Sequence, residues 1–272
     1  IHAGILSRVV AALEEKGITR LYRHQARTIS LIRDGTHTVM AAGTAAGKSL
    51  GYQVPLAEAA LADRRATALL IFPTKALTQD QFASLYHLGL KQLVPAVYDG
   101  DTEPEARTWA RRHANVVLTN PDMLHVGILP GHARWARFLG NLGLVVVDEL
   151  HTYRGIFGSH VALVLRRLRR LAAHYGAHPT FVFSSATIGN PGELASRLTG
   201  LPTVTVDDDA SPAGAKQVVV WNPPLEDTGT GERRSALSEA TDLLVDLVRR
   251  GHHTIAFTRS RKGVELVYRW AR

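Results

Sequence analysis

The sequence predicts an α/β fold in which helices cover both faces of a doubly wound, parallel β-sheet. Short apolar runs alternate along the chain with longer segments of helical periodicity, as expected for buried strands joined by crossover helices. A loop of small residues, 42–49, stands between one such run and a helical segment. Polar motifs directly follow several apolar runs, and these would meet beyond the carboxyl ends of the strands.

Composition narrows the class of protein. With 272 residues, 45% of them hydrophobic, the chain suits one large domain or two globular domains. No apolar run is long enough for a membrane span, and the first residues lack the pattern of a signal peptide. The absence of cysteine excludes disulfides and thiolate metal sites and favours a cytoplasmic, reducing location. A net charge of +8 favours a polyanionic partner.

Periodicity and end signals predict the elements in order. Strands are expected at 38–41, 66–72, 94–98, 115–119, 144–147, 180–183 and 203–206. Pro95 marks the third of these as an edge strand or a strand start. Helices are expected at 5–16, 24–33, 50–62, from 73–77 onward, around Trp109, at 160–174 after a loop at 152–159, and at 191–198.

Composition changes abruptly at residues 207–214, which are rich in Asp, Ser, Pro and Gly and are expected to form a linker. Beyond it we expect strands at 217–221 and 253–257, a loop at 222–234, and helices at 235–250 and from 258–261 onward. These elements are too few for a second complete domain of the same design. The predicted domains are therefore 1–206 and an incomplete 207–272.

The loop Ala42-Gly43-Thr44-Ala45-Ala46-Gly47-Lys48-Ser49 has the spacing of a phosphate-binding loop, with alanine at its first position. Small residues let backbone N–H groups approach a phosphate, and the following helix adds its partial positive charge. Lys48 is placed to reach the β- and γ-phosphates, and the Ser49 hydroxyl to bind Mg²⁺. A chance turn rich in Gly and Ala is the alternative.

Two residues upstream of this loop are candidates for binding the base. The amide of Gln25 both donates and accepts, which matches the edge of adenine, although a surface helix residue is the more common occurrence. Tyr22 is expected either to stack on the base or to belong to the core.

Asp148 and Glu149 follow the most apolar predicted strand. ATP hydrolysis needs a carboxylate for the metal ion and a group that orients or deprotonates water. We assign Asp148 to Mg²⁺ and Glu149 to the role of base, with Lys48 as the third catalytic residue. An acidic turn at a strand end is the alternative.

The order of these motifs resembles that of superfamily 2 helicases of the DEAD/DEAH-like kind. The series comprises Gln25, Ala42–Ser49, Pro73-Thr74-Lys75, Thr119-Asn120-Pro121-Asp122, Asp148-Glu149-Leu150-His151 and Ser185-Ala186-Thr187. The stretch 148–171, together with 184–199 and 258–261, is similar to the MrfA-type, Hrq-related DNA-repair helicases, which carry a zinc-binding C-terminal region. The resemblance implies a RecA-like first domain and the beginning of a second RecA-like domain.

The resemblance also implies roles for individual residues. His151, Ser185 and Thr187 would couple the nucleotide state to nucleic-acid binding. The residues that would line the track for the strand are Pro73, Thr74, Lys75, Gly100, Thr119, Asn120 and Pro121 in the first domain, and Thr258, Arg259 and Ser260 in the second. Thr, Asn and Lys suit phosphate oxygens, which carry no sequence information.

Ordinary structural roles compete with several of these assignments. Thr74 and Thr119 are good helix caps or turn formers in any protein. The arginine-rich helix containing Arg166, Arg167, Arg169 and Arg170 is more typical of a solvated face than of a DNA surface. The 13 histidines show no spacing typical of a metal site.

The sequence thus predicts the ATP- and Mg²⁺-binding core of an ATP-dependent DNA helicase or translocase that acts on single-stranded DNA in DNA repair. An RNA helicase is one alternative, and a nucleotide-dependent binding module without effective turnover is another. The family's later motifs and zinc-binding region have no counterpart here. We therefore expect a truncated chain that needs the remainder of the helicase as its partner and hydrolyses ATP weakly on its own.

Overall fold

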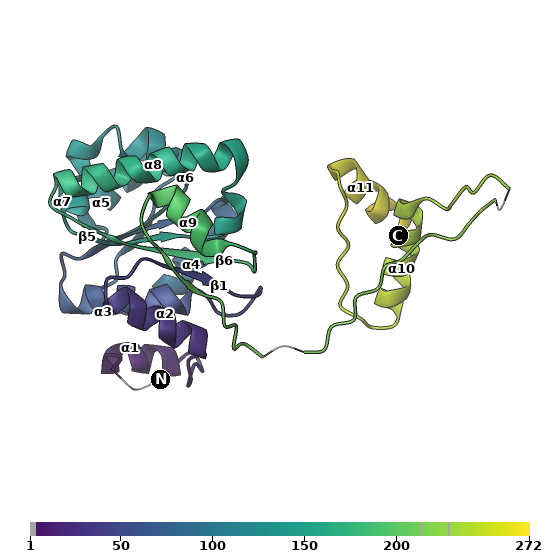
Figure 1. Cartoon of the computed structure of the whole chain (residues 1–272), viewed down its shortest axis with the longest axis horizontal. Coiled ribbons are helices and arrows are strands. Elements are labelled where there is room, and N and C mark those ends of the chain that lie inside the picture. The colour runs from purple at the N-terminus through teal and green to yellow at the C-terminus, as the bar shows by residue number, and fades with distance from the viewer. Residues whose placement is uncertain (1–3, 213, 228) are drawn as a thin grey trace. The chain divides into compact units, whose positions relative to one another are not determined.

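The computed structural model describes residues 4–212, 214–227 and 229–272 (Figure 1). Within it, residues 1–213 and 214–272 form two separate compact units. The first unit contains the whole β-sheet and all the motifs of the nucleotide site. Each unit is described below by itself.

The first unit is built on a seven-stranded sheet whose strand order is β3-β4-β2-β5-β6-β1-β7. The strands are β1 Thr38–Ala41, β2 Thr67–Ile71, β3 Pro95–Val97, β4 Val116–Thr119, β5 Leu142–Val147, β6 Thr180–Ser185 and β7 Val204–Val206. All neighbouring strands pair in parallel. The predicted doubly wound parallel sheet is confirmed, and the Pro95 strand lies at its edge.

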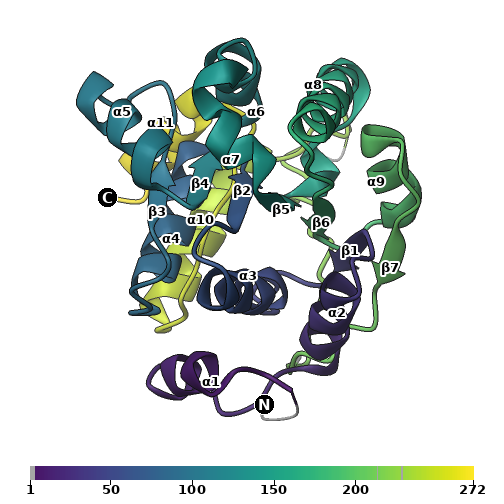
Figure 2. The same cartoon turned by 90° about the vertical axis from the view of Figure 1, so that its left-hand side faces the viewer.

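Helices cover the two faces of this sheet (Figure 1). One face packs against α1 Ser7–Glu14, α2 Arg23–Arg33, α3 Leu50–Ala62 and α4 Lys75–Tyr86. The other packs against α5 Pro104–His113, α7 Ala136–Gly140, α8 Gly155–His174 and α9 Pro191–Thr199. Figure 2 shows α3 on one side of the central strands and α7 and α8 on the other.

Alternation along the strands explains the two layers. In β2, Ala68 and Leu70 join the core beneath α1–α4, whereas Leu69 and Ile71 join the core beneath α8. Because both faces are buried, the strands are continuous apolar runs rather than alternating ones, which is why the sequence pattern identified them.

Two details of the first unit differ from the sequence prediction. Helix α8 begins at Gly155, within the predicted loop 152–159, and a side chain at Gly158 in its first turn would collide with the Tyr153 backbone. Between β4 and β5 the chain forms the short helical segments α6 Pro121–Met123, η1 Leu124–Ile128, η2 His132–Trp135 and α7. These segments are too short to produce a helical period that could be recognised in the sequence.

In the second unit, helices α10 Ala236–Arg249 and α11 Arg261–Trp270 confirm both predicted helices. The strands predicted at 217–221 and 253–257 do not form. Strands are stabilised by pairing with a neighbour, and no ladder is present among the described residues of this unit apart from one bridge between Leu225 and Arg233. Val220 and Phe257 consequently remain 92% and 87% exposed.

Candidate nucleotide-binding and catalytic site

Loops from adjacent strands bring the predicted motifs together at the carboxyl ends of the strands, along one side of the sheet. The phosphate loop follows β1, the Asp148 motif follows β5, and the Ser185 motif ends β6. These three strands are neighbours in the order β5-β6-β1. The segments with Pro73 and Gly100 follow β2 and β3, and Thr119 is the last residue of β4. These three strands form the adjoining half of the sheet. The carboxyl ends of the strands therefore carry two adjacent sets of loops. One set, after β5, β6 and β1, holds the predicted nucleotide-site motifs, and the other, after β3, β4 and β2, holds the predicted track residues.

The phosphate loop has the backbone of a tight anion-binding turn. Both Ala45 and Gly47 have positive φ angles, 61° and 66°. Lys48 Nζ donates to the carbonyl oxygens of Ala42 and Gly43 at 3.1 and 2.7 Å. The lysine is thus folded back on its own loop and must turn to reach a bound phosphate. Ser49 begins α3 without a side-chain capping bond, which leaves its hydroxyl for another partner.

The start of α2 holds this loop from the side. Gln25 accepts from the Tyr22 N–H at 2.8 Å through Oε1 and donates to the Gly47 carbonyl at 2.8 Å through Nε2. The preceding residue, His24, lies 3.0 Å from the Ala46 carbonyl through Nε2. Both side chains are buried. The interpretation of Gln25 as a surface helix residue is therefore wrong, because its amide supports the phosphate loop.

Tyr22 lies at the rim of this region. Its ring is 37% exposed and stacks on the His24 ring at a centroid distance of 5.6 Å. The exposure is more than a core residue shows and leaves a flat apolar face beside Gln25. A purine base could stack on this face, so contact of Tyr22 and Gln25 with adenine stays a prediction.

A methyl group at position 47 should disrupt the loop. The Cβ of Gly47→Ala would lie 2.6 Å from Gln25 Nε2, at a backbone angle that L-residues rarely adopt. We expect this variant to weaken binding of a fluorescent ATP analogue by about tenfold or more, equivalent to about 1.4 kcal/mol.

Gly89→Ala is the matched control, because Gly89 has the same positive φ, 67°, but no atom within 4 Å of its virtual Cβ. It should lose some stability while retaining nucleotide affinity. Equal affinity of the two variants would show that the contact between Gln25 and Gly47 does not shape the loop.

Asp148 follows β5 and lies almost fully buried, with 9% exposure. Its Oδ1 accepts from the Glu149 N–H at 2.9 Å and from the Ser184 hydroxyl. Burial raises the pKa of Asp148 to about 6, with a further increase from the Glu149 charge. The Glu149 N–H and the Lys48 charge oppose this rise in pKa. Asp148 is thus a desolvated carboxylate within the electrostatic reach of Lys48.

Glu149 occupies a strained position. Its φ of 53° places a non-glycine residue in the left-handed region, where strain often accompanies a functional role. The conformation is held because the Glu149 carbonyl accepts from the N–H and the hydroxyl of Thr152, at 2.9 and 2.8 Å. Its Oε2 lies 3.2 Å from Nδ1 of His151.

His151 connects Glu149 to the end of β6. The Ala186 N–H donates to Nδ1 of His151 at 3.4 Å, so this nitrogen faces both Ala186 and the Glu149 carboxylate. When Nδ1 carries a proton it can donate to the Glu149 carboxylate. When it does not, it can accept from the Ala186 N–H. Beside them, Ser185 has a buried hydroxyl without a partner and Thr187 is exposed. The coupling roles of His151, Ser185 and Thr187 remain predictions.

Sequence reasoning missed two side chains of this site, His24 and Ser184. Both are polar residues that are buried and bonded to a motif residue or to the phosphate loop. Their positions directly beside Gln25 and Ser185 were the available signal. Their contacts span 22 and 36 residues and could not be inferred from local pattern.

These residues fit a nucleotide with Mg²⁺. Asp148 and Ser49 provide the carboxylate and hydroxyl oxygens that Mg²⁺ prefers, and Lys48 and the loop N–H groups suit phosphate oxygens. No group of three or more His, Asp or Glu side chains that could hold a metal ion occurs among the described residues. The arrangement can hold a triphosphate and present Glu149 to a water molecule.

The adjoining half of the edge presents only part of the predicted track. Thr74, Lys75 and Gly100 are exposed, and Pro73 and Asn120 are half-buried. Thr119 is buried and donates to the Tyr98 carbonyl at 2.7 Å, and Pro121 is buried as well. The Thr119 hydroxyl is thus used within the fold, and Pro121 forms the first turn of α6. Their place along a nucleic-acid track stays a prediction.

Helix capping explains further residues of this half. Thr74 and Asn120 accept from the N–H groups of Leu77 and Met123, at 3.4 and 2.8 Å, and so cap α4 and α6. Lys75 forms an ion pair with Asp101. This pair lies in the open and can exchange its carboxylate for a phosphate, so capping and strand contact are compatible for this loop.

Two of the four arginines of α8 are bonded to a neighbouring helix. Arg166 and Arg169 donate to the carbonyl oxygens of Arg197 and Thr199 in the last turn of α9. Cations suit this position because the C-terminal end of a helix carries a partial negative charge. In the second unit, Thr258 donates to the Ser260 carbonyl and Ser260 caps α11, while Arg259 is exposed.

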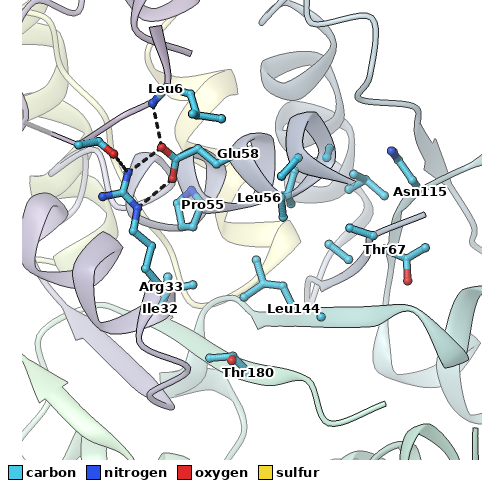
Figure 3. A pocket seen from close by; sticks show the side chains of 18 residues that line it. Leu6, Ile32, Arg33, Pro55, Leu56, Glu58, Thr67, Asn115, Leu144 and Thr180 are labelled. Atoms are coloured by element: carbon cyan, nitrogen blue, oxygen red, sulfur yellow. Dashed lines mark hydrogen bonds and ion pairs between the residues drawn. The ribbon is translucent and has the colours of Figure 1, made fainter. Parts of the chain in front are cut away.

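An apolar cavity lies at the opposite end of the sheet, beside the first residues of β2, β5 and β6 (Figure 3). Its volume is about 470 Å³, and an ion pair of 2.6 Å between Arg33 and Glu58 stands at its side. Thr67 and Asn115 line it but bond to the chain itself, to Phe138 and to Gln92 and Val94. None of the predicted motif residues lines this cavity, so it lies apart from the candidate functional site.

Among the helices that the structure describes, none combines the length and apolar character needed to cross a bilayer.

Comparison with known proteins identifies the family. Residues 22–194 match the DEAD/DEAH box helicase family. The chain is 44% identical over 264 residues to the uncharacterized ATP-dependent helicase YprA of Bacillus subtilis, covering 96% of this chain and 35% of that protein. It is 43% identical over 259 residues to the ATP-dependent helicase HRQ1 of Saccharomyces cerevisiae, covering 92% and 24%.

Solved structures agree with this match. The helicase MrfA bound to DNA and AMPPNP superimposes with a TM-score of 0.93 at 43% identity, covering 98% of this chain and 38% of that one. The chain thus spans about a third or less of the length of these curated relatives. Its fold is RecA-like, and the chain belongs to the DEAD/DEAH box helicase family.

Proposed function

We propose that this chain is the ATP-binding and nucleic-acid-binding core of an ATP-dependent DNA helicase or translocase. The observation that carries the proposal is the convergence of Lys48, Ser49, Asp148, Glu149 and His151 at one sheet edge, beside exposed loops that suit a phosphate backbone. In domain terms, residues 1–206 provide the ATP-binding domain, and 207–272 a linker and the beginning of a second RecA-like domain. The other partner is the remainder of such a helicase.

The residues divide the work as their geometry suggests. Lys48 leaves the carbonyls of Ala42 and Gly43 and binds the β- and γ-phosphates. Ser49 and Asp148 would hold Mg²⁺ through a hydroxyl and a carboxylate oxygen, and the ion would supply positive charge beside the phosphates. Glu149 orients the attacking water and accepts its proton. His151 moves its hydrogen bond between Glu149 and the Ala186 N–H and so reports the state of the site to the end of β6.

Supporting evidence for DNA rather than RNA comes from relatives with more than 40% identity. The MrfA structures are described as bound to DNA, with and without AMPPNP. The exposed track residues address the backbone and do not themselves distinguish the two nucleic acids. A role in DNA repair follows from the family resemblance alone.

Steady-state ATP hydrolysis tests this proposal. We expect the chain to bind a fluorescent ATP analogue with Mg²⁺, and its hydrolysis to be stimulated more by single-stranded DNA than by RNA of the same sequence. The 2′-hydroxyl is the only difference between the two sugar-phosphate backbones. A DNA strand and an RNA strand of matching sequence therefore test its effect on the rate of hydrolysis. Stronger stimulation by RNA would favour an RNA helicase, and binding without any stimulated turnover would favour a binding module.

A further inference from the structure

The beginning of the predicted linker is bonded to the phosphate loop. Asp209 Oδ2 accepts from the Gly43 N–H at 2.8 Å, and the Ala210 N–H donates to Nδ1 of His24 at 3.2 Å. The other ring nitrogen of His24 lies 3.0 Å from the Ala46 carbonyl of the loop. We call Asp209, Ala210 and His24 the linker latch. It ties a segment that leads out of the first unit to the residues that would hold phosphates.

The hydrogen bonds of His24 define its state. Because Ala210 donates to Nδ1, that nitrogen carries no proton, and Nε2–H donates to Ala46. His24 thus bridges the two segments, with one ring nitrogen facing the linker and the other facing the loop. Its side chain is fully buried, so it cannot exchange either partner for water without moving.

Asp209 adds a negative charge at the loop that must accept a triphosphate. The Ser211 hydroxyl, the Gly43 N–H and the Ser211 N–H lower the pKa of Asp209 to about 2, so the carboxylate is charged at neutral pH. The carbonyl of the same residue, Gly43, accepts from Lys48 at 2.7 Å. Gly43 is therefore held from both sides in a state in which Lys48 is turned away from a phosphate.

We propose that the linker latch and bound nucleotide oppose each other, so that Asp209 weakens nucleotide binding and nucleotide binding loosens the linker. This inference rests on the proposed function, because it concerns the same phosphate loop. Linkage requires the two effects to be equal in size. His24 is the positioning residue: a shift of the phosphate loop at Ala46 on nucleotide binding would move the His24 ring and weaken its hydrogen bond to Ala210.

The test compares three versions of the 272-residue chain, the wild type and two variants, for binding of a fluorescent ATP analogue with Mg²⁺. Asp209→Asn keeps an oxygen that can accept from Gly43 but removes the charge, and should tighten binding by about fivefold. Asp207→Asn is the matched control: it removes an equal charge from the same acidic run at an exposed side chain and should leave the affinity within about twofold of wild type.

Amide hydrogen exchange gives the second, reciprocal measurement. Exchange at Ala210 should be slow in the free wild-type chain and several-fold faster when nucleotide saturates the site. If Asp209→Asn binds no more tightly than Asp207→Asn, or if nucleotide leaves Ala210 exchange unchanged, the latch is overturned. If the wild-type chain binds no nucleotide at all, the proposed function is overturned as well, which separates the two failures.

Discussion

Glu149→Gln is expected to lower the rate of ATP hydrolysis by roughly 10²–10⁴-fold while changing nucleotide affinity little. Glutamine preserves the size of the side chain and its ability to accept a hydrogen bond, but an amide cannot take a proton from water. The backbone of residue 149 is fixed by contacts that do not involve its carboxylate, namely the Asp148 carboxylate and Thr152. The substitution therefore leaves the backbone contacts of residue 149 in place and alters the side-chain contact with His151.

Single-turnover hydrolysis and equilibrium binding of the ATP analogue together check this expectation. Glu193→Gln is the matched control, because it removes the same charge from an exposed position on α9, where Glu193 pairs with Arg197. It should retain the wild-type rate. A Glu149→Gln chain that turns over ATP at the wild-type rate would exclude Glu149 as the base.

The sheet and the phosphate loop could be predicted because their signals are local. Strands buried on both faces, such as 144–147, are unbroken apolar runs, and the loop 42–49 carries its chemistry in consecutive residues. The seven strands of the first unit appear where the pattern placed them, with differences of one or two residues at most ends.

The remaining features depend on contacts between distant segments. Nothing local indicates that His24 joins Ala46 to Ala210, or that Ser184 donates to Asp148. Thr119 has the sequence context of a track residue, yet its hydroxyl turns inward to Tyr98. The segments 217–221 and 253–257 have strand-forming sequences without strand neighbours, which shows that propensity is insufficient where pairing is absent.

Asp148→Asn is expected to stabilise the first unit while removing its response to Mg²⁺. Burial raises the pKa of Asp148 from 3.8 to about 6, so between these values the folded chain binds more protons than the unfolded chain. Stability therefore falls as pH rises from about 4 to about 6. Above pH 6 the buried charge lowers the free energy of unfolding by about 1–3 kcal/mol, because each pKa unit corresponds to about 1.4 kcal/mol.

Urea denaturation at pH 4 and at pH 7.5 measures this difference. The variant should exceed wild type by about 1–3 kcal/mol at pH 7.5 and match it near pH 4, where the wild-type carboxyl is protonated. Asp34→Asn, at an exposed position, should show no such difference. Added Mg²⁺ with nucleotide should stabilise wild type and not the variant, because the carboxylate is the ligand that the metal ion needs.

A variant that is less stable than wild type at both pH values would mean that the Asp148 charge is satisfied by Ser184 and the Glu149 N–H. With the expected outcome, the chain keeps a destabilising carboxylate at the end of β5, where a charged oxygen would serve as the metal ligand. Active sites commonly retain groups that function requires even though those groups lower the stability of the folded protein. The strained backbone of Glu149, one residue later, is a second case at the same strand end.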